Sequence, residues 1–174
     1  MKSRTNTILV FLFALIAFTF TSCSNGSDDD IAGAGSETLK ATINGKEVVY
    51  TNVRARWVDN SNYLEIIGKH DNTNLMITIL TDAEKVPAGS YSLDDNTPYS
   101  ILAVHNEMLE NNQQKNHTAS RGTTWNDEFS FKIDEISSSH VKGSFSGVMV
   151  VGQASQVLST MTVENGSFNI PLAK

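Results

Sequence analysis

The chain has 174 residues, with 13 lysines and arginines against 19 aspartates and glutamates, and its formal net charge at pH 7 is −6. An acidic surface repels polyanions, which disfavours nucleic acid as a partner. Hydrophobic residues make up 40% of the chain, enough to build one domain with a core of its own. A single cysteine excludes an internal disulfide framework, so the core alone must stabilise the fold.

The N-terminal segment has the pattern of a secretory signal peptide. Lys2 and Arg4 form a short positive region, and the unbroken apolar run ILVFLFALIAF follows over residues 8–18. A membrane-spanning helix needs about 20 apolar residues, whereas the apolar part of a signal peptide needs about 7–15. We therefore predict that residues 1–22 are a signal peptide and take no part in the fold.

The unique cysteine, Cys23, follows this segment directly. Phe20, Thr21 and Ser22 place a bulky residue and two small residues ahead of it. This arrangement resembles the lipobox of bacterial lipoproteins, although Phe20 stands where leucine is usual. The resemblance implies that Cys23 carries a diacylglycerol, with fatty acids such as palmitate, and becomes the new N-terminus. The alternative for Cys23, a buried free thiol, does not fit a polar, glycine-rich stretch.

An acidic tract lies just downstream of the cysteine. Ser27, Asp28, Asp29 and Asp30 are similar to the export signal that carries lipoproteins of the Bacteroidota to the outer face of the outer membrane. The resemblance implies a lipid-anchored protein at the cell surface. Residues 23–37 are rich in Gly, Ser and Asp, so we expect them to form a flexible tether between the lipid and the domain.

The folded domain is predicted to cover residues 38–174 and to be all-β. Asn44 and Gly45 lie between two β-branched runs, which is the strongest short signal for a hairpin with a type I′ turn. Alternation of apolar and polar residues predicts the further strands, about 8–11 in all, in an antiparallel β-sandwich or a lipocalin-like β-barrel. These further strands are 53–59, 63–69, 75–80, 90–93, 100–105, 128–133, 141–151, 157–163 and 167–172.

Two features of the pattern carry specific expectations. In the strand 141–151, Gly143 and Gly147 share a face with Phe145, which indicates either a bend or the close approach of another backbone there. Residues 106–127 are polar and rich in Asn and Gln, so they are expected to form a long loop, either functional or a solvated insertion. Trp125, near the end of this segment, is a candidate ligand contact, because an indole ring can stack on a sugar; the alternative is a core residue entering a strand.

Three segments of the domain carry a second resemblance. ATINGKEVVY, AGSYSL and VKGSFSGVMV with MTVENGSFNIPL resemble uncharacterised flavobacterial lipoprotein domains, which are small β domains. The likeness covers roughly residues 38–172 and rests on turn and core residues. It implies an all-β surface lipoprotein and carries over no catalytic residue.

The search for chemistry finds no catalytic constellation and no metal or cofactor motif. The four histidines are far apart in sequence and lack the spacing of a metal site. His105 and Glu107 would share a face of a strand, but a surface polar pair is the preferred interpretation. Asp94, Asp95 and Asn96 are more typical of a turn than of a cation-binding site.

We therefore expect a non-catalytic binding or scaffolding domain, an accessory to the uptake of glycans or other polymers. The alternative is a lipocalin-like carrier of a small apolar ligand, and hydrolase activity is a weaker third reading because no constellation supports it. The expected partners are the membrane, through the lipid, and a glycan, a protein or a small apolar ligand. A monomer without cofactor or metal is expected, with no catalytic residue.

Overall fold

The structure is a computed structural model that describes residues 37–58, 62–81 and 84–173, all of them within the compact unit Ala34–Lys174. These residues contain eleven strands and no α-helix, which confirms the all-β prediction. The strands are β1 (Thr38–Ile43), β2 (Lys46–Val49), β3 (Thr51–Trp57), β4 (Leu64–His70), β5 (Thr73–Leu80), β6 (Gly89–Ser92), β7 (Ser100–Met108), β8 (Gln114–Ser120), β9 (Glu128–Ile136), β10 (His140–Gln153) and β11 (Gln156–Ala173).

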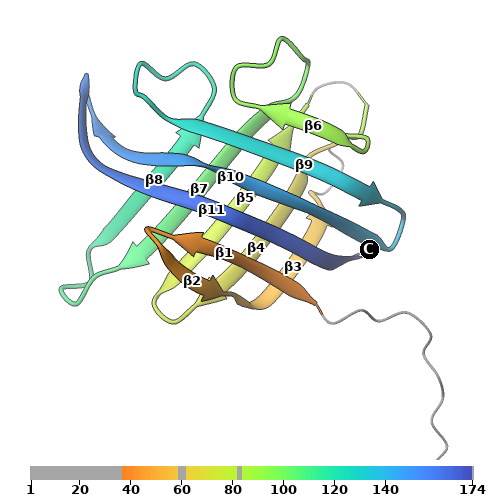
Figure 1. Ribbon diagram of the computed structural model, residues 1–174, viewed down its shortest axis with the longest axis horizontal. Coiled ribbons are helices and arrows are strands. Elements are labelled where there is room, and N and C mark those ends of the chain that lie inside the picture. The colour runs from red at the N-terminus through yellow and green to blue at the C-terminus, as the bar shows by residue number, and fades with distance from the viewer. Residues whose placement is uncertain (1–36, 59–61, 82–83, 174) are drawn as a thin grey trace, which may run out of the picture. The chain divides into compact units, whose positions relative to one another are not determined.

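The strands form two layers that face each other across the core (Figure 1). One layer contains β3, β4, β5, β7 and β8, and the other contains β2, β1, β11, β10, β9 and β6. All but one of the pairings between neighbours are antiparallel. Both sandwich and barrel were expected as alternatives, and the observed domain combines features of the two.

Two junctions join the layers. At one junction the end of β11 pairs in parallel with β3, through Leu172 with Ala55 and Ala173 with Arg56. At the other junction β10 pairs with β8 at a single position, Val150 with Thr118. Together with the β10–β11 pairing, these contacts close a ring of β3, β4, β5, β7, β8, β10 and β11 among the described residues. The long β10–β11 hairpin of one layer thus pairs with β3 and β8, the two edge strands of the other layer.

The Asn–Gly hairpin is confirmed. Asn44 and Gly45 have φ values of 48° and 81°, in the left-handed region that a type I′ turn requires. β1 and β2 pair on either side of them. Asn44 also ties the turn to β11, because its backbone N–H donates to the carbonyl of Thr162 at 3.0 Å and its side-chain Oδ1 accepts from the N–H of Thr162 at 2.9 Å.

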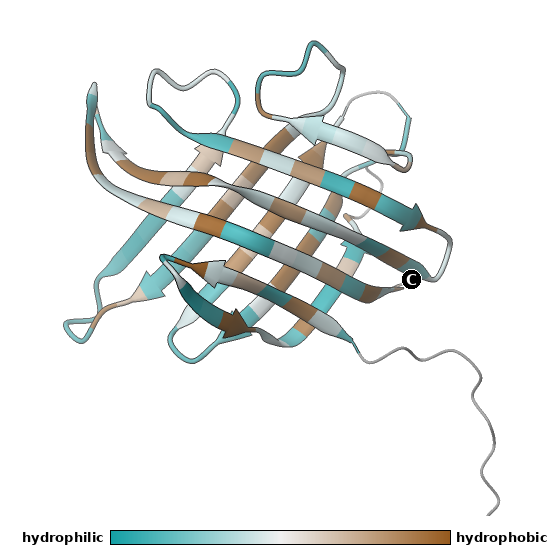
Figure 2. Cartoon of the chain, in the orientation of Figure 1, coloured by the Kyte–Doolittle hydropathy of each residue, from teal (hydrophilic) through white to brown (hydrophobic). Residues whose placement is uncertain are grey.

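The core of the β9, β10 and β11 layer is a stack of phenyl rings. Phe131 stacks on Phe168 with ring centroids 5.1 Å apart, and Phe145 lies between Phe168 and Phe129 at 6.5 and 6.0 Å. Along β9 the hydropathy alternates residue by residue, as Figure 2 shows, because every second side chain enters this core. Offset aromatic pairs of this kind contribute about 0.5–1.5 kcal/mol each beyond their buried area.

Of the two alternatives for the β10 glycines, the close approach of another backbone is confirmed. A Cβ on Gly143 would overlap the carbonyl oxygen of Lys132, and a Cβ on Gly147 would overlap that of Glu128. Both carbonyls belong to the neighbouring strand β9. Glycine is therefore required at these positions so that β9 can lie against β10.

The expected loop over residues 106–127 is wrong. β7 continues to Met108, and the segment then turns and returns as β8, which pairs with β7 along its whole length. The alternation signal was missing because two of the side chains that β7 and β8 send into the core are histidines, His105 and His117, while the outward side chains of β8 are polar. Pairing with β7 stabilises β8 without an apolar face of the usual composition.

The two strands expected at 157–163 and 167–172 are a single strand, β11, with an irregularity in its middle. The register with β10 shifts near Gly166, and Asn165 has a φ of 51°. Such a bulge bends the strand, so that its first part and its last part can pair with different neighbours. Gly166 is buried here, and a Cβ on it would lie 2.5 Å from the carbonyl oxygen of Phe145.

Candidate functional site

A pocket of about 680 Å³ opens on the outer face of the layer formed by β6, β9, β10 and β11. We call it the hydroxyl pocket, because serine is its commonest lining residue. Its volume falls in the usual range for ligand sites, about 300–1,000 Å³. The hydroxyl pocket is lined by Ser90, Tyr91, Ser92, Asp95, Ser130, Phe131, Lys132, Ser144, Phe145, Ser146, Glu164, Asn165 and Gly166.

The serines reach the pocket because of strand alternation. In β6, β9 and β10 a serine stands on one or both sides of a buried aromatic residue, as in Ser90–Ser92, Ser130–Lys132 and Ser144–Ser146. The aromatic residue points into the core, so its neighbours point outward. Three adjacent strands that share this triplet therefore present hydroxyl groups on one surface.

Strand register brings these side chains into two parallel rows. Ser146 lies opposite Ser130, which lies opposite Ser92. In the next row Ser144 lies opposite Lys132, which lies opposite Ser90. Neighbouring strands are about 4.8 Å apart, so each row spaces its polar groups at that interval on a sheet that holds them in place.

Asp95 forms one end of the pocket. Its carboxylate accepts hydrogen bonds from the backbone N–H and the hydroxyl group of Ser92, both at 2.7 Å. These two hydrogen bonds lower the pKa of Asp95 below its ordinary value, and the one from the Ser92 side chain has the larger effect. The carboxylate therefore carries a negative charge at neutral pH. The prediction of a turn at Asp94–Asn96 is confirmed by this geometry.

The segment that holds Asp95 is fixed by Arg121, which follows β8. The guanidinium group donates to the carbonyl oxygens of Leu93 at 2.9 Å and Thr97 at 3.1 Å, and also to that of Asp95. A planar group with five N–H donors can satisfy several carbonyls of one turn at once, which lysine cannot do. Arg121 thus positions one rim of the pocket from the opposite layer.

Charges at the pocket are few and of both signs. Lys132 makes an ion pair with Asp134, the next outward residue of β9, at 2.6 Å, and both side chains are substantially exposed. Glu164 and Asn165 line the opposite side, at the bulge of β11. In the part of the chain that the structure describes, no group of three or more His, Cys, Asp or Glu side chains could hold a metal ion. The lining thus offers hydrogen-bond donors and acceptors more than charge.

The residues singled out from the sequence lie elsewhere. Cys23 and the acidic tract Ser27, Asp28, Asp29 and Asp30 fall outside the described residues. Trp125 does not line the pocket: its ring packs on Gly152 of β10, where a Cβ would lie 2.6 Å from Cη2, and its Nε1–H donates to the carbonyl of Ala154 at 3.3 Å. The indole therefore fastens the segment before β9 onto the β10–β11 hairpin.

The pocket residues were missed from the sequence, although a signal for them exists. The triplets SYS, SFK and SFS repeat one pattern, a serine beside a residue that must be buried. Each triplet alone predicts only an amphipathic strand. The triplets line one pocket because the strand register aligns them. Register between strands that are distant in sequence cannot be predicted from composition.

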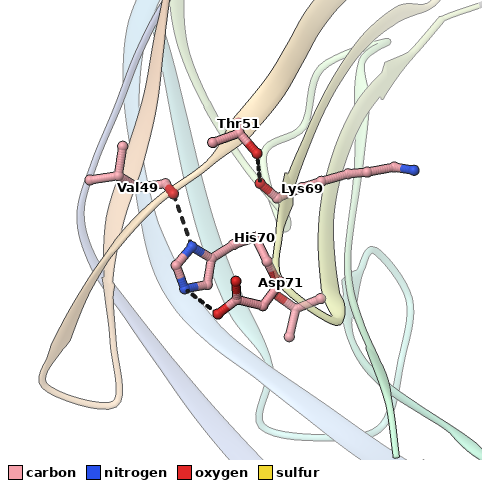
Figure 3. Close-up of polar contacts among 6 residues, drawn as sticks. Val49, Thr51, Lys69, His70 and Asp71 are labelled. Atoms are coloured by element: carbon pink, nitrogen blue, oxygen red, sulfur yellow. Dashed lines mark hydrogen bonds and ion pairs between the residues drawn. The ribbon is translucent and has the colours of Figure 1, made fainter.

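The histidines occupy three different environments. His70, at the end of β4, has its Nδ1 3.0 Å from the carbonyl oxygen of Val49 and its Nε2 3.5 Å from Oδ2 of Asp71 (Figure 3). His140 begins β10 and is partly exposed. His105 and His117 are buried, so the expected surface pair of His105 with Glu107 is wrong: His105 faces the core, because β7 sends alternate residues inward.

Comparison of the chain with protein-family models, with curated proteins and with solved structures finds no match. Within the described residues, no helix has the length and apolar character needed to cross a membrane.

Proposed function

We propose that this protein is a non-catalytic binding domain that takes a polyhydroxylated ligand, a glycan chain, in the hydroxyl pocket. The observation that carries the proposal is the alignment of five serine hydroxyls, from three strands, along one open pocket. Each hydroxyl is a donor and an acceptor at once, as is each hydroxyl group of a sugar. A pocket lined by such groups can therefore form hydrogen bonds with a ligand that carries a hydroxyl group at many positions.

Rigidity supports the same function. Ser130 and Ser146 lie on strands, and Phe129, Phe131 and Phe145 beneath them are stacked in the core. Binding groups held by packed strands lose little side-chain entropy when a ligand arrives. The open form of the pocket, on an outer face, suits a segment of a long chain whose two ends continue into solvent.

The anchor belongs to the same proposal. A diacylglycerol on Cys23 and the export tract at Ser27–Asp30 would display the domain on the outer face of the outer membrane, where polymers are captured before uptake. Two acyl chains make attachment long-lived, at about 0.8 kcal/mol per buried CH₂. The domain would work as a monomer, with the membrane and a glycan as its partners.

The alternative is a lipocalin-like carrier of a small apolar ligand. A carrier of that kind needs interior space within the ring of strands. Between β9, β10 and β11 the interior is occupied by the stacked rings of Phe129, Phe131, Phe145 and Phe168. A surface pocket for a polar chain is therefore the preferred function.

Isothermal titration with a panel of neutral oligosaccharides tests the proposal. Ser146 is exposed, so Ser146→Tyr fills the pocket without entering the core, and Thr160→Tyr, at an exposed position of β11 outside the pocket, is the matched control. We expect at least a tenfold loss of affinity in Ser146→Tyr and wild-type affinity in Thr160→Tyr. Equal affinity in the two variants, or no oligosaccharide bound by the wild type, would remove the pocket as a glycan site.

A further inference from the structure

His105 on β7 and His117 on β8 lie directly opposite each other in an antiparallel pair. Their exposed fractions are 5% and 3%, and both point to the core side of the layer, on the faces that also carry Ala103 and Ala119. Histidine is rarely buried to this extent without a specific partner. Two of them at one register position form a buried polar pair beside the apolar core.

The neighbours of the pair come from four strands. On the next inward position of the same two strands, Glu107 lies opposite Lys115. Leu75 of β5 is the partner of His105 on its other side. From β11, the hydroxyl group of Ser159 lies 3.1 Å from Nε2 of His117. The pair therefore lies where the β10–β11 hairpin closes the ring against β8.

One ring nitrogen of each histidine is buried and makes no hydrogen bond among the described residues. Among the described residues, neither Nδ1 of His105 nor Nδ1 of His117 has a hydrogen-bond partner, and both atoms are buried. A buried polar atom without a partner costs about 1–3 kcal/mol. Two such atoms on facing residues destabilise the fold twice at one place. Apolar side chains at these positions would avoid this cost, so a purely structural role does not account for the two histidines.

The contact with Ser159 indicates which nitrogen of His117 can coordinate a cation. A neutral imidazole with one N–H engaged leaves a lone pair on the other nitrogen. When Nε2–H of His117 donates to Ser159, that lone pair is on Nδ1, the atom without a partner.

We propose that His105 and His117 form a two-histidine site for a divalent transition metal ion, with Ser159 as the positioning residue of His117. Directly opposite residues of an antiparallel pair have Cβ atoms about 5 Å apart. Two nitrogens bound to one tetrahedral ion at about 2.0 Å lie about 3.3 Å from each other, a separation that rings on such Cβ atoms can reach. Hydrogen bonding of the second ring nitrogen to a fixed group is the usual arrangement for a ligating histidine.

Imidazole ligands suit Zn²⁺, Cu²⁺ and Ni²⁺. The described residues supply no third His, Cys, Asp or Glu to complete a group around the pair, so any further ligand of the ion would be water or a bound molecule. Sequence spacing gave no hint of this site, because His105 and His117 are brought together by a hairpin that was expected to be a loop. The site is independent of the hydroxyl pocket and of its glycan.

Calorimetric titration of the full chain with ZnCl₂, in detergent, tests the site. The chain carries Cys23→Ser throughout, because a free thiol would itself bind the ion. We expect one equivalent of Zn²⁺ per chain, no binding in His117→Ala, and a loss of affinity of about 10- to 100-fold in Ser159→Ala. His140→Gln, at a partly exposed histidine on β10, is the matched control and is expected to bind as the parent does.

Ring-nitrogen NMR spectra keep the test decisive if His117→Ala does not fold. Zn²⁺ should then shift the Nδ1 resonances of His105 and His117 in the parent chain and leave those of His140 unchanged. No heat of binding in the parent, wild-type affinity in Ser159→Ala, or shifts confined to other histidines would each overturn the proposal.

Discussion

Gly143 offers a sharp test of the packing beneath the hydroxyl pocket. In Gly143→Ala the new Cβ would overlap the carbonyl oxygen of Lys132 and lie 2.5 Å from Cζ of Phe168. The phenyl ring is already stacked on Phe131, and the carbonyl belongs to the backbone of β9, so neither obstacle can rotate away.

The magnitude follows from two opposing terms. Overpacking a filled interior costs about 1–3 kcal/mol, and this position belongs at the upper end because a backbone must move. Replacing glycine by alanine restricts the unfolded chain and returns about 0.4–1 kcal/mol. The net loss in the free energy of unfolding is about 2 kcal/mol, which lowers the melting temperature of a domain of this size by about 7 °C.

Urea denaturation followed by circular dichroism measures this difference. Ser144→Ala is the matched control: it lies next to Gly143 on the same strand but points outward, and its expected effect is within about 0.5 kcal/mol. A Gly143→Ala protein as stable as the wild type would refute the close approach of β9 and β10, and with it the register that builds the pocket.

Three further outcomes are expected. Arg121→Ala removes the guanidinium hydrogen bonds to the carbonyls of residues 93–97 and should lower the free energy of unfolding in urea by about 1–3 kcal/mol, while Arg54→Ala, at an exposed arginine of β3, should leave it unchanged. The pKa of Asp95, followed by carboxyl NMR, should lie below 3.8 and rise in Ser92→Ala. Because this pKa is lowered in the folded state, the stabilisation by Asp95 is present above the ordinary pKa and is lost as the pH falls below it; a midpoint unmoved by Ser92→Ala would contradict the assigned hydrogen bonds. Labelling of cells with a clickable fatty acid should mark the wild type and not Cys23→Ala, and protease treatment of intact cells should remove the domain; label without protease sensitivity would place the anchor in the periplasm, and no label would refute the anchor.

Much of the fold could be predicted from local patterns. Strands such as β9 alternate a phenyl ring with a polar residue, and the turn at Asn44 and Gly45 is specified by residues that tolerate positive φ. β8 could not be predicted in this way, because His117 occupies an inward position that alternation assigns to an apolar side chain. Its identity as a strand depends on pairing with β7, a tertiary effect that local propensity does not contain.

The candidate sites divide along the same line. The sequence by itself determined the all-β class and the inward faces of most strands, because both follow from the alternation of neighbouring residues. Only the tertiary structure decided that the serines of three strands form one pocket and that His105 faces His117. Register between strands is set by the packing of the whole core and the closure of the ring, so no short segment of the chain carries that information.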